Sequence, residues 1–295
     1  MWKSDKWKEY ELLDTSDGER LERWGNCTLV RPDPQVVWKD CRKNPMWNKA
    51  DGIYKRSSSG GGGWKSRGRL KQEWYISYDL EIGKKLTFMI KPTGFKHTGL
   101  FPEQAANWEW LSNLIRKRTE AGGSVKVLNL FAYTGGATAA AAAAGASVCH
   151  VDASRGMVMQ AKENARLSGL EDSPIRYIVD DCKKFVEREI RRGNRYDAII
   201  MDPPSYGRGP SGEVWKLEDN IDSFIKLASQ VISDNPLFFL VNSYTAGLSP
   251  SVIKYIIDTT DKLNGGTSMA DELGLPVTET KLILPCGSAV RWQIN

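Results

Sequence analysis

The chain has 295 residues, a formal net charge of +5, 41% hydrophobic residues and 26% charged residues. This length predicts one large domain or an ordinary domain with a smaller companion, and the composition is typical of a globular protein with a real core. No apolar run reaches the roughly 18 residues of a membrane span, and the polar N-terminus does not resemble a signal peptide, so we expect a cytoplasmic protein without membrane segments. The five cysteines are scattered and form no C-x-x-C pair, which argues against a disulfide framework or a zinc ribbon.

Residues 1–92 are predicted to form a small, basic, β-rich domain. The first 90 residues hold 18 lysines and arginines against 13 acidic residues, and they carry seven of the eleven tryptophans. Alternating apolar and polar side chains predict strands over 24–30 and 74–80, and a further short strand covers 86–90. Cations together with aromatic rings favour contact with a polyanion such as RNA, although a surplus of five charges also fits a role in solubility alone.

Segment 55–71 combines six cations and five glycines with no acidic residue. This composition predicts a flexible loop. Arg67, Arg69 and Lys71 would bind substrate phosphates if the loop closes on RNA. The same pattern also fits a hairpin tip without a function.

From residue 93 onward, strands and helices alternate. Helices are predicted over 102–115, 135–144, 155–168, 183–192, 216–232 and 251–263, and strands over 125–131, 147–152, 175–180, 196–202, 236–241, 278–284 and 289–294. This alternation predicts an α/β domain over residues 93–295, with a Rossmann-like, mainly parallel sheet of seven strands and helices on both faces. The last two strands, joined by a tight turn at 285–288, would pair antiparallel at one edge.

Ligands of open α/β sheets bind at the carboxyl ends of the strands. After the first strand, Gly135 and Gly136 would let the backbone approach a ligand closely. Neither a G-x-G-x-x-G motif nor a G-x-x-x-x-G-K-[ST] phosphate loop occurs, which disfavours a dinucleotide or a nucleoside triphosphate. Asp152 ends the second strand, where it could accept both ribose hydroxyls. Asp181 and Cys182 follow the third strand, where they could address adenine.

These strand ends together predict a site for S-adenosylmethionine, which carries a ribose, an adenine and a charged amino acid tail but no phosphate. Each feature alone has a simpler explanation, because a Gly-Gly pair is commonly a tight turn and an aspartate after a strand commonly caps the next helix. The order of all three along the chain favours the cofactor site.

The fourth strand leads into residues 202–206, which read Asp-Pro-Pro-Ser-Tyr. Two prolines remove two N–H donors, so their carbonyls and the Asp202 carboxylate can accept from the amino group of a nucleobase. Tyr206 could stack on that base and Arg208 could bind its phosphate. Asp202, Pro203 and Tyr206 are therefore the predicted catalytic residues. A rigid turn followed by an ordinary loop cation is the alternative.

The chain has only two histidines. His97 lies near the predicted cofactor site, where it would either contact the ligand or pack, and His150 lies in a buried strand, where we expect a structural role. No Ser-His-Asp set and no metal-spaced cluster occurs, so a hydrolase or a metalloenzyme has no support and we expect no metal.

Over residues 88–245 the sequence resembles the class I S-adenosylmethionine-dependent methyltransferases. Within that class it is similar to the bacterial enzymes that methylate 23S ribosomal RNA at cytosine C5 or guanine N7. The segments that carry the resemblance are 97–104 (HTGLFPEQ), 128–136 (LNLFAYTGG), 151–154 (VDAS), 180–182 (DDC) and 201–206 (MDPPSY).

The resemblance implies an in-line methyl transfer with S-adenosylmethionine as cofactor and ribosomal RNA as partner. The cofactor-binding residues that it implies are Thr98, Phe101, Gln104, Asn129, Phe131, Tyr133, Thr134, Gly135, Gly136, Asp152, Ala153, Ser154, Asp181, Cys182 and Asp202. It also implies that Asp202, Pro203 and Tyr206 face both the methyl group and its acceptor.

Two positions depart from the family pattern. Glu103 replaces an aspartate, and Tyr244 stands where the cytosine C5 enzymes carry a nucleophilic cysteine. A phenol is a poor substitute for a thiolate at pH 7, so a base nitrogen is the favoured acceptor. The alternatives are a small-molecule or protein N-methyltransferase, or a non-catalytic RNA-binding or ribosome assembly factor with this fold. The sequence does not predict an oligomeric state.

Overall fold

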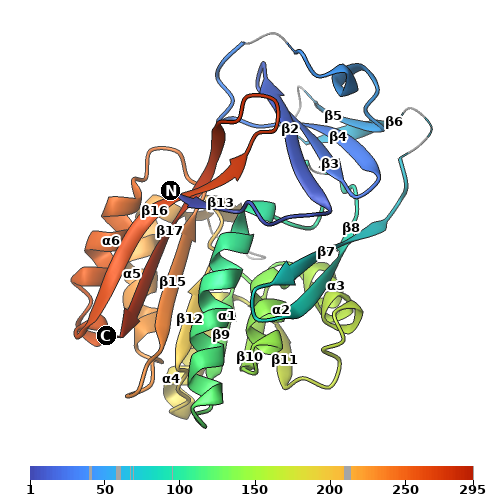
Figure 1. Cartoon of the computed structure of the whole chain (residues 1–295). Coiled ribbons are helices and arrows are strands. Elements are labelled where there is room, and N and C mark those ends of the chain that lie inside the picture. Colours follow the sequence, from blue (N-terminus) through green and yellow to red (C-terminus); the bar gives the residue numbers. More distant parts are fainter. Residues whose placement is uncertain are drawn as a thin grey trace. The chain divides into compact units, whose positions relative to one another are not determined.

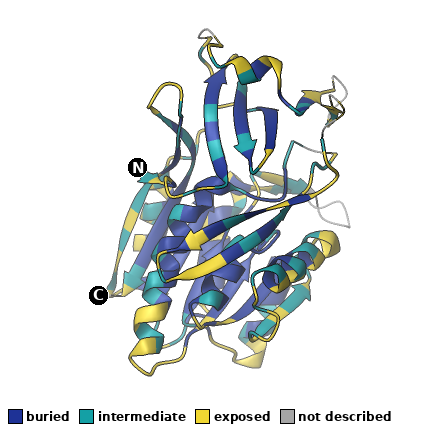
Figure 2. Ribbon diagram, turned by 45° about the vertical axis from the view of Figure 1, so that its right-hand side comes forward, coloured by how far each residue is buried: buried dark blue, intermediate teal, exposed yellow. Residues whose placement is uncertain are grey.

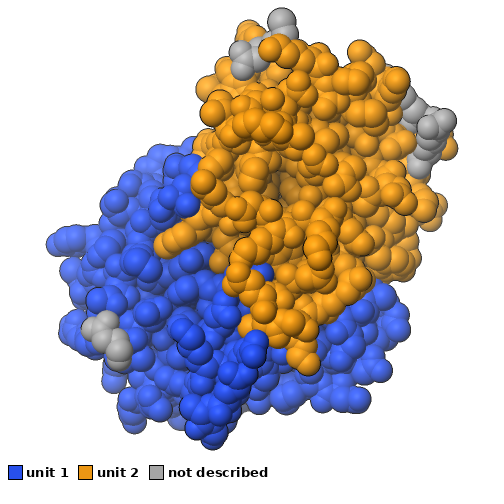
Figure 3. All heavy atoms as spheres, viewed as in Figure 1, with its two compact units in different colours: residues 1, 107–272, 287–295 blue, residues 2–106, 273–286 orange. Residues whose placement is uncertain are grey.

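The computed structural model describes residues 1–39, 42–57, 61–66, 68, 70–94, 96–207 and 214–294, together with the backbone of Arg208. The chain forms two compact units, coloured separately in Figure 3. Unit 1 comprises residues 1, 107–272 and 287–295, and unit 2 comprises residues 2–106 and 273–286. The division into domains 1–92 and 93–295 stays a prediction. The compact units change between residues 106 and 107, and a C-terminal segment belongs to the N-terminal unit.

A mainly parallel sheet organises unit 1. Its strand order is β1-β16-β17-β15-β12-β9-β10-β11. The strands are β1 (Trp2–Lys3), β9 (Lys126–Leu130), β10 (Ser147–Asp152), β11 (Ile175–Val179), β12 (Ala198–Met201), β15 (Phe238–Ser243), β16 (Gly266–Pro276) and β17 (Ile283–Ile294). Strands β15, β12, β9, β10 and β11 pair in parallel, whereas β17 runs antiparallel to β15. The predicted Rossmann-like sheet is confirmed, with the two-residue β1 in addition to seven longer strands.

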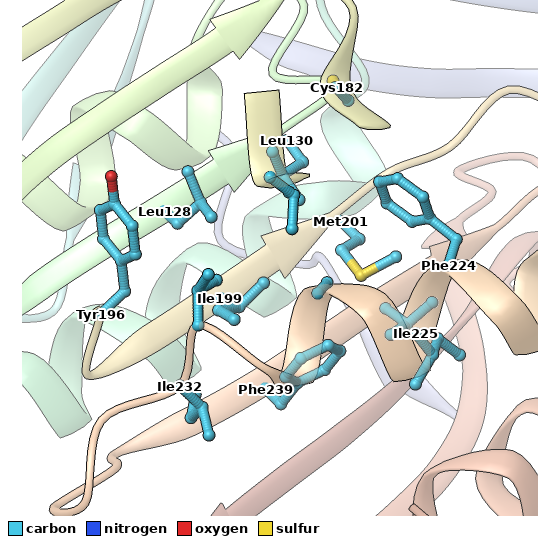
Figure 4. Packing of buried hydrophobic residues seen from close by; sticks show 14 of the residues in the cluster. Leu128, Leu130, Cys182, Tyr196, Ile199, Met201, Phe224, Ile225, Ile232 and Phe239 are labelled. Carbon is cyan, nitrogen blue, oxygen red and sulfur yellow. The ribbon is translucent and has the colours of Figure 1, made fainter. Parts of the chain in front are cut away.

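Helices cover both faces of this sheet (Figure 1). They are α1 (Ala105–Glu120), α2 (Gly136–Ala143), α3 (Arg155–Leu167), α4 (Cys182–Arg192), α5 (Leu217–Ser229) and α6 (Pro250–Asp258), with the short 3-10 helix η3 (Asp261–Leu263). The central strands are accordingly buried along nearly their whole length (Figure 2). Leu128 and Leu130 pack with Phe224 of α5 in the main core cluster (Figure 4). Because side chains alternate along a strand, Asn129 points to the opposite face, where it contacts α2.

Of the two predicted C-terminal strands, 289–294 lies inside the longer β17, whereas 278–284 was misplaced, because β16 ends at Pro276 and β17 begins at Ile283. Pro285 and Gly287 were interpreted as turn residues, but both lie inside β17, and the chain turns between β16 and β17, where Lys281 has a φ of 61°. Pro285 precedes the part of β17 that pairs with β15, so its missing N–H breaks no bond of that ladder. Gly287 is needed for packing, because a Cβ there would lie 2.8 Å from the ring of Tyr244.

Unit 2 contains two antiparallel-rich sheets. The first has the order β2-β3-β4-β5-β6 and the second pairs β7 with β8. The elements are β2 (Tyr10–Ser16), β3 (Glu19–Trp24), β4 (Cys27–Pro32), η1 (Pro45–Asn48), β5 (Gly52–Arg56), β6 (Gly62–Ser66), β7 (Trp74–Leu80), β8 (Lys84–Ile90) and η2 (Pro102–Gln104). The β-rich character of the N-terminal region is thus confirmed, and strand 74–80 was predicted to the residue.

Two predictions in this region need correction. The expected strand 24–30 is interrupted by a hairpin turn at residues 25–26, with Gly25 in a left-handed conformation at φ 59°, and its residues 27–30 belong to β4. The expected flexible loop 55–71 is partly the strand pair β5–β6. Gly62 serves this pairing, since a Cβ there would lie 2.3 Å from the carbonyl oxygen of Lys55. Residues 58–60, 67 and 69 lie outside the described residues.

The described residues include four cysteines, at positions 27, 149, 182 and 286, and all four are buried free thiols. No helix in the described ranges combines the length and the apolar character that a membrane crossing requires.

A buried ion-pair network joins β2, β3 and β4 in unit 2. The Glu22 carboxylate accepts from Nε and Nη2 of Arg31 at 2.6 and 2.8 Å and from the Tyr10 hydroxyl at 2.8 Å. The Nε of Arg20 lies 3.3 Å from the same carboxylate. Burial alone would raise the pKa of Glu22, but the two arginines outweigh burial and lower it to about 2. Glu22 is therefore ionised and compensates two buried cations.

We expect Glu22→Gln to lower the free energy of unfolding by about 3 kcal/mol at pH 7, because it leaves two buried guanidinium groups without their shared anion. Because the folded-state pKa lies below the ordinary 4.5, this contribution is present above pH 4.5 and is lost as the pH falls toward 2. Urea unfolding at several pH values measures both effects. The control is Glu81→Gln, which removes an exposed ion pair with Lys6 and should cost less than about 1 kcal/mol. Equal losses in the two variants would contradict this role of Glu22.

Candidate active site

The loop between β9 and α2 has an unusual backbone. Phe131, Tyr133 and Gly135 have φ values of 54°, 50° and 80°, and non-glycine residues in this region cost on the order of 1–3 kcal/mol each. The chain holds the loop at three points. The Phe131 N–H lies 3.2 Å from Sγ of Cys182, the Tyr133 N–H donates to Asp152 at 2.9 Å, and the Thr134 carbonyl accepts from Asn164 at 2.8 Å.

The two glycines of this loop serve packing as well as conformation. A Cβ at Gly135 would lie 2.9 Å from Cβ of Ala161 in α3, and a Cβ at Gly136 would lie 2.6 Å from the indole of Trp108. The sequence interpretation, a close backbone approach to a ligand, stays a prediction. The demonstrated close approaches are to α1 and α3.

Asp152 at the end of β10 joins two strand ends. Its Oδ2 accepts from the N–H of Tyr133 at 2.9 Å and its Oδ1 accepts from the N–H of Ser154 at 2.8 Å. Each carboxylate oxygen has more than one acceptor direction, so both remain available to a ligand hydroxyl. Ala153 and Ser154 are exposed beside it.

A buried polar row lies under the loop, on the sheet face that α2 covers. The amide of Asn129 donates to Oγ1 of Thr138 at 2.9 Å, and this hydroxyl lies 2.9 Å from Nδ1 of His150. Burial lowers the pKa of His150 to about 4, so the ring is neutral near pH 7. Asn129 was predicted to contact the cofactor. The Asn129 amide donates to Thr138 of α2. Among the described contacts, Asn129 therefore holds the helix that follows the loop.

The end of β11 supplies two adjacent carboxylates. Asp180 forms an ion pair with Arg188, and Asp181 caps α4 by accepting from the N–H of Lys184 at 2.9 Å. Cys182 is the first residue of α4 and its thiol is buried in the core. The Cys182 thiol is thus not presented to a ligand, and the predicted contact of this residue with adenine stays a prediction.

The segment after β12 is fixed by two tryptophan contacts. It leads into the hairpin of β13 (Tyr206–Arg208) and β14 (Val214–Lys216). The indole Nε1 of Trp215 donates to the carbonyl of Pro204 at 2.7 Å, and the Trp215 ring lies 5.7 Å from that of Phe131. Trp215 thus ties this segment to the loop after β9. Tyr206 keeps 53% of its surface exposed.

The carboxyl ends of four neighbouring strands therefore form one edge of unit 1. The residues at or just after these strand ends include four with carboxylates, Asp152, Asp180, Asp181 and Asp202. Arg188 compensates the charge of Asp180, but the other three carboxylates keep this edge acidic, which disfavours a ligand with phosphates and favours one with a positive charge, hydroxyl groups and an exocyclic amine. S-adenosylmethionine has all three, so the donor set fits this cofactor. In the described ranges no three His, Cys, Asp or Glu side chains are grouped so as to hold a metal.

The other predicted site residues lie elsewhere or outside the described part. Thr98, Phe101 and Gln104 belong to unit 2, where the buried Thr98 hydroxyl has no hydrogen-bond partner among the described residues. Lys71 is exposed in unit 2. Arg67, Arg69 and the Arg208 side chain lie outside the described residues.

Sequence reasoning missed Asn164, which holds the loop after β9 from the buried face of α3. A signal was present, because Asn164 is the polar member of an apolar stripe that contains Val158, Ala161 and Ala165. It also missed the bond between the hydroxyls of Thr245 and Ser205, 2.7 Å apart, which ties the segment after β15 to the segment after β12.

Comparison with known proteins gives a consistent assignment. A family model described as S-adenosylmethionine-dependent methyltransferase matches residues 59–242. The crystal structure of a SAM-dependent methyltransferase from Agrobacterium tumefaciens is 35% identical, with a TM-score of 0.88 over 99% of this chain and 93% of that chain. SMU.776, a protein assigned as a methyltransferase and crystallised with SAH, shares the fold at 20% identity, with a TM-score of 0.75 over 98% of this chain and 76% of that chain.

Among curated proteins, the chain is 29% identical over 201 residues to the ribosomal RNA large subunit methyltransferase K/L of Shewanella baltica. The match covers 67% of this chain and 26% of that protein, so the chain spans about a quarter of the length of the curated relatives it matches.

We expect Asp152→Ala to weaken binding of S-adenosylhomocysteine by about 2–3 kcal/mol, since it removes a charged acceptor and one support of the loop. Isothermal titration calorimetry measures the affinity. Asp172→Ala is the matched control, because Asp172 is an exposed carboxylate between α3 and β11. Unchanged affinity in Asp152→Ala would remove this residue from the cofactor site.

Proposed function

We propose, from the premise that this chain belongs to the S-adenosylmethionine-dependent methyltransferases, that it methylates a base of ribosomal RNA, with 23S RNA as the first candidate. The curated relatives are ribosomal RNA large subunit methyltransferases, although the chain spans 26% of their length. The positive surplus of the first 90 residues suits an RNA substrate. In this proposal residues 1–92 hold RNA and residues 93–295 carry out the transfer.

The proposed acceptor is a base nitrogen rather than cytosine C5. Methylation at C5 requires a thiolate that adds to the ring. Tyr244 packs against Gly287 in the segment after β15, where the resemblance expects that cysteine. The four described thiols are poor substitutes, since all are buried and burial raises the pKa of each of them, to about 11 for Cys149 and about 12 for Cys27.

When bound, S-adenosylmethionine supplies a methyl group on an activated sulfonium. The protein therefore has to position the acceptor and exclude water rather than provide a nucleophile. The Asp202 carboxylate and the Pro203 carbonyl would accept N–H groups of the base. The Pro204 carbonyl is already bonded to Trp215, so one of the two predicted carbonyl acceptors is in use. Tyr206 would stack on the base, a contact worth about 1–3 kcal/mol.

The observation that carries this proposal is the acidic edge of the sheet together with the exposed Tyr206 in the segment that follows Asp202. Incubation with methyl-labelled cofactor and either naked ribosomal RNA or ribosomal particles tests it, with the modified nucleotide mapped by mass spectrometry. Labelled protein or labelled small molecules in a cell extract, with no labelled RNA, would favour a small-molecule or protein N-methyltransferase. Cofactor binding without any transfer would favour a non-catalytic assembly factor.

We expect Asp202→Ala to lower the rate of methyl transfer about a hundredfold or more, because the base loses its charged acceptor in the transition state. The affinity for S-adenosylhomocysteine should change much less. Single-turnover kinetics and calorimetry measure the two quantities, with Asp234→Ala, an exposed carboxylate, as the control. A large loss of cofactor affinity with an unchanged rate at saturation would assign Asp202 to the cofactor instead.

A further inference from the structure

Unit 2 contains a cavity of about 620 Å³ that is lined by residues of this unit alone. It lies where the turn between β3 and β4 meets the start of β7, and residues that precede β2 and β5 complete its lining. All of the lining residues lie within the described ranges. The volume falls within the roughly 300–1,000 Å³ that is typical of sites for small ligands.

Hydrogen bonds hold the segments around this cavity together. The N–H of Gly25, in the turn, donates to the carbonyl of Glu9 at 2.6 Å. Asp51 Oδ2 accepts from the N–H of Thr28 at 2.8 Å, which ties the residue before β5 to β4. The turn also lies close to β7, since a Cβ on Gly25 would be 3.9 Å from the carbonyl oxygen of Tyr75. The lining is therefore fixed by the fold of unit 2.

The lining combines hydrogen-bonding groups with an aromatic ring. Asp51 is half-buried, and its carboxylate has acceptor directions beyond the one that Thr28 uses. Asn26 is exposed, and its amide offers both a donor and an acceptor. Tyr75 keeps 48% of its surface exposed, and its hydroxyl donates to Glu73 at 3.2 Å.

The charges of the lining disfavour a free phosphate or a metal ion as the ligand. Three of the lining residues are carboxylates and two are cations. One of the cations, Arg23, is already paired with Glu11, with 3.1 Å between Nε and Oε2. Nowhere in the described ranges are three His, Cys, Asp or Glu side chains grouped so as to hold a metal. Lys71, which is exposed, is the remaining cation of the lining.

We propose that this cavity binds an unpaired nucleobase of the RNA substrate, and that it selects a base with an exocyclic amino group. Asp51 accepts from the amino group, Asn26 bonds the edge of the base, and Tyr75 stacks on its plane. Lys71 contacts the neighbouring phosphate. Proteins commonly recognise single-stranded RNA by aromatic stacking together with hydrogen bonds to base edges. That the base belongs to RNA rests on the proposed function, whereas the selection of an amino group rests on the cavity.

Asp51→Asn tests this selection, because the new amide oxygen can keep the bond to Thr28 while its NH2 group replaces an acceptor with a donor. Oligocytidine and oligouridine of equal length carry the same phosphates, but cytosine has an amino group where uracil has a carbonyl oxygen. We expect the wild type to bind oligocytidine about tenfold more tightly, as for one charged hydrogen bond. Asp51→Asn should lose or reverse this preference.

Fluorescence anisotropy at constant salt measures both affinities. The matched control is Asp17→Asn, since Asp17 is an exposed aspartate of the same unit outside the cavity lining, and it should keep the preference. A wild type without preference, or the same preference in Asp51→Asn as in the control, would overturn the proposal.

The stacking contact has its own test. Tyr75→Ala should weaken the binding of both oligonucleotides about tenfold, the size of one lost stacking contact, whereas Tyr75→Phe should keep the affinity. Tyr255→Ala, which removes an exposed tyrosine of α6 in unit 1, is the control. Equal affinities of Tyr75→Ala and Tyr255→Ala would contradict the site.

Asp202→Ala separates this cavity from the proposed acceptor site. If Asp202→Ala abolishes the preference for cytidine and Asp51→Asn does not, the preference belongs to the acceptor site and the cavity proposal fails. If the preference depends on Asp51 but the protein methylates no RNA, the proposed function fails and the cavity site stands. If RNA is methylated and Asp51→Asn leaves the preference unchanged, the proposed function stands and the cavity site fails.

Discussion

The Asp152 carboxylate accepts one N–H from the loop after β9 and one from the residues that open α3, so a single side chain joins the ends of two neighbouring strands. The rest of the cofactor edge depends on this junction. Phe131 and Tyr133 occupy left-handed conformations that cost energy, and they persist because hydrogen bonds from three elements determine the path of the loop. The geometry of the loop in turn decides which backbone groups face a ligand. If Asp152 binds the ribose, the same carboxylate both contacts the cofactor and maintains the path of the loop.

The sheet could be predicted because its strands are covered on both faces. Burial on both faces requires short, almost wholly apolar runs, and such runs are visible in the sequence, as in 198–201 (AIIM), which lies inside the predicted strand 196–202. The C-terminal strands could not be located in this way. Pro285 and Gly287 look like turn residues, but the ladder with β15 begins after the proline, and the glycine makes room for Tyr244. A local pattern does not reveal a neighbour that is 43 residues away in the chain.

The candidate site was predictable to the same degree and for the same reason. Strand ends can be placed along the sequence, so Asp152, Asp181 and Asp202 could be assigned to the ends of neighbouring strands, and their roles stay predictions. The contacts that orient the strand ends come from residues distant in sequence. Trp215 donates to Pro204, Asn164 donates to Thr134, and Thr245 bonds Ser205. Each of these pairs is brought together by the folding of the chain, and the spacing of apolar residues in the sequence does not reveal it. Fully buried polar residues within predicted helices are the exception, because a polar side chain on an apolar stripe already indicates a hydrogen bond inside the protein.

The two units differ in charge in a way that suits the proposed RNA substrate. Unit 1 presents carboxylates at its strand ends, which stabilise a sulfonium and accept from hydroxyl and amino groups. The same carboxylates would repel the backbone of a nucleic acid, so a site that holds the donor is poorly suited to hold the phosphates of the acceptor. The first 90 residues, which belong to unit 2 apart from Met1, carry a surplus of five positive charges. Under the proposed function, this separation of charge would let the cationic cofactor and the RNA each meet a surface of opposite sign. A small neutral acceptor would need only the first of these surfaces, and the surplus in unit 2 would then have no partner.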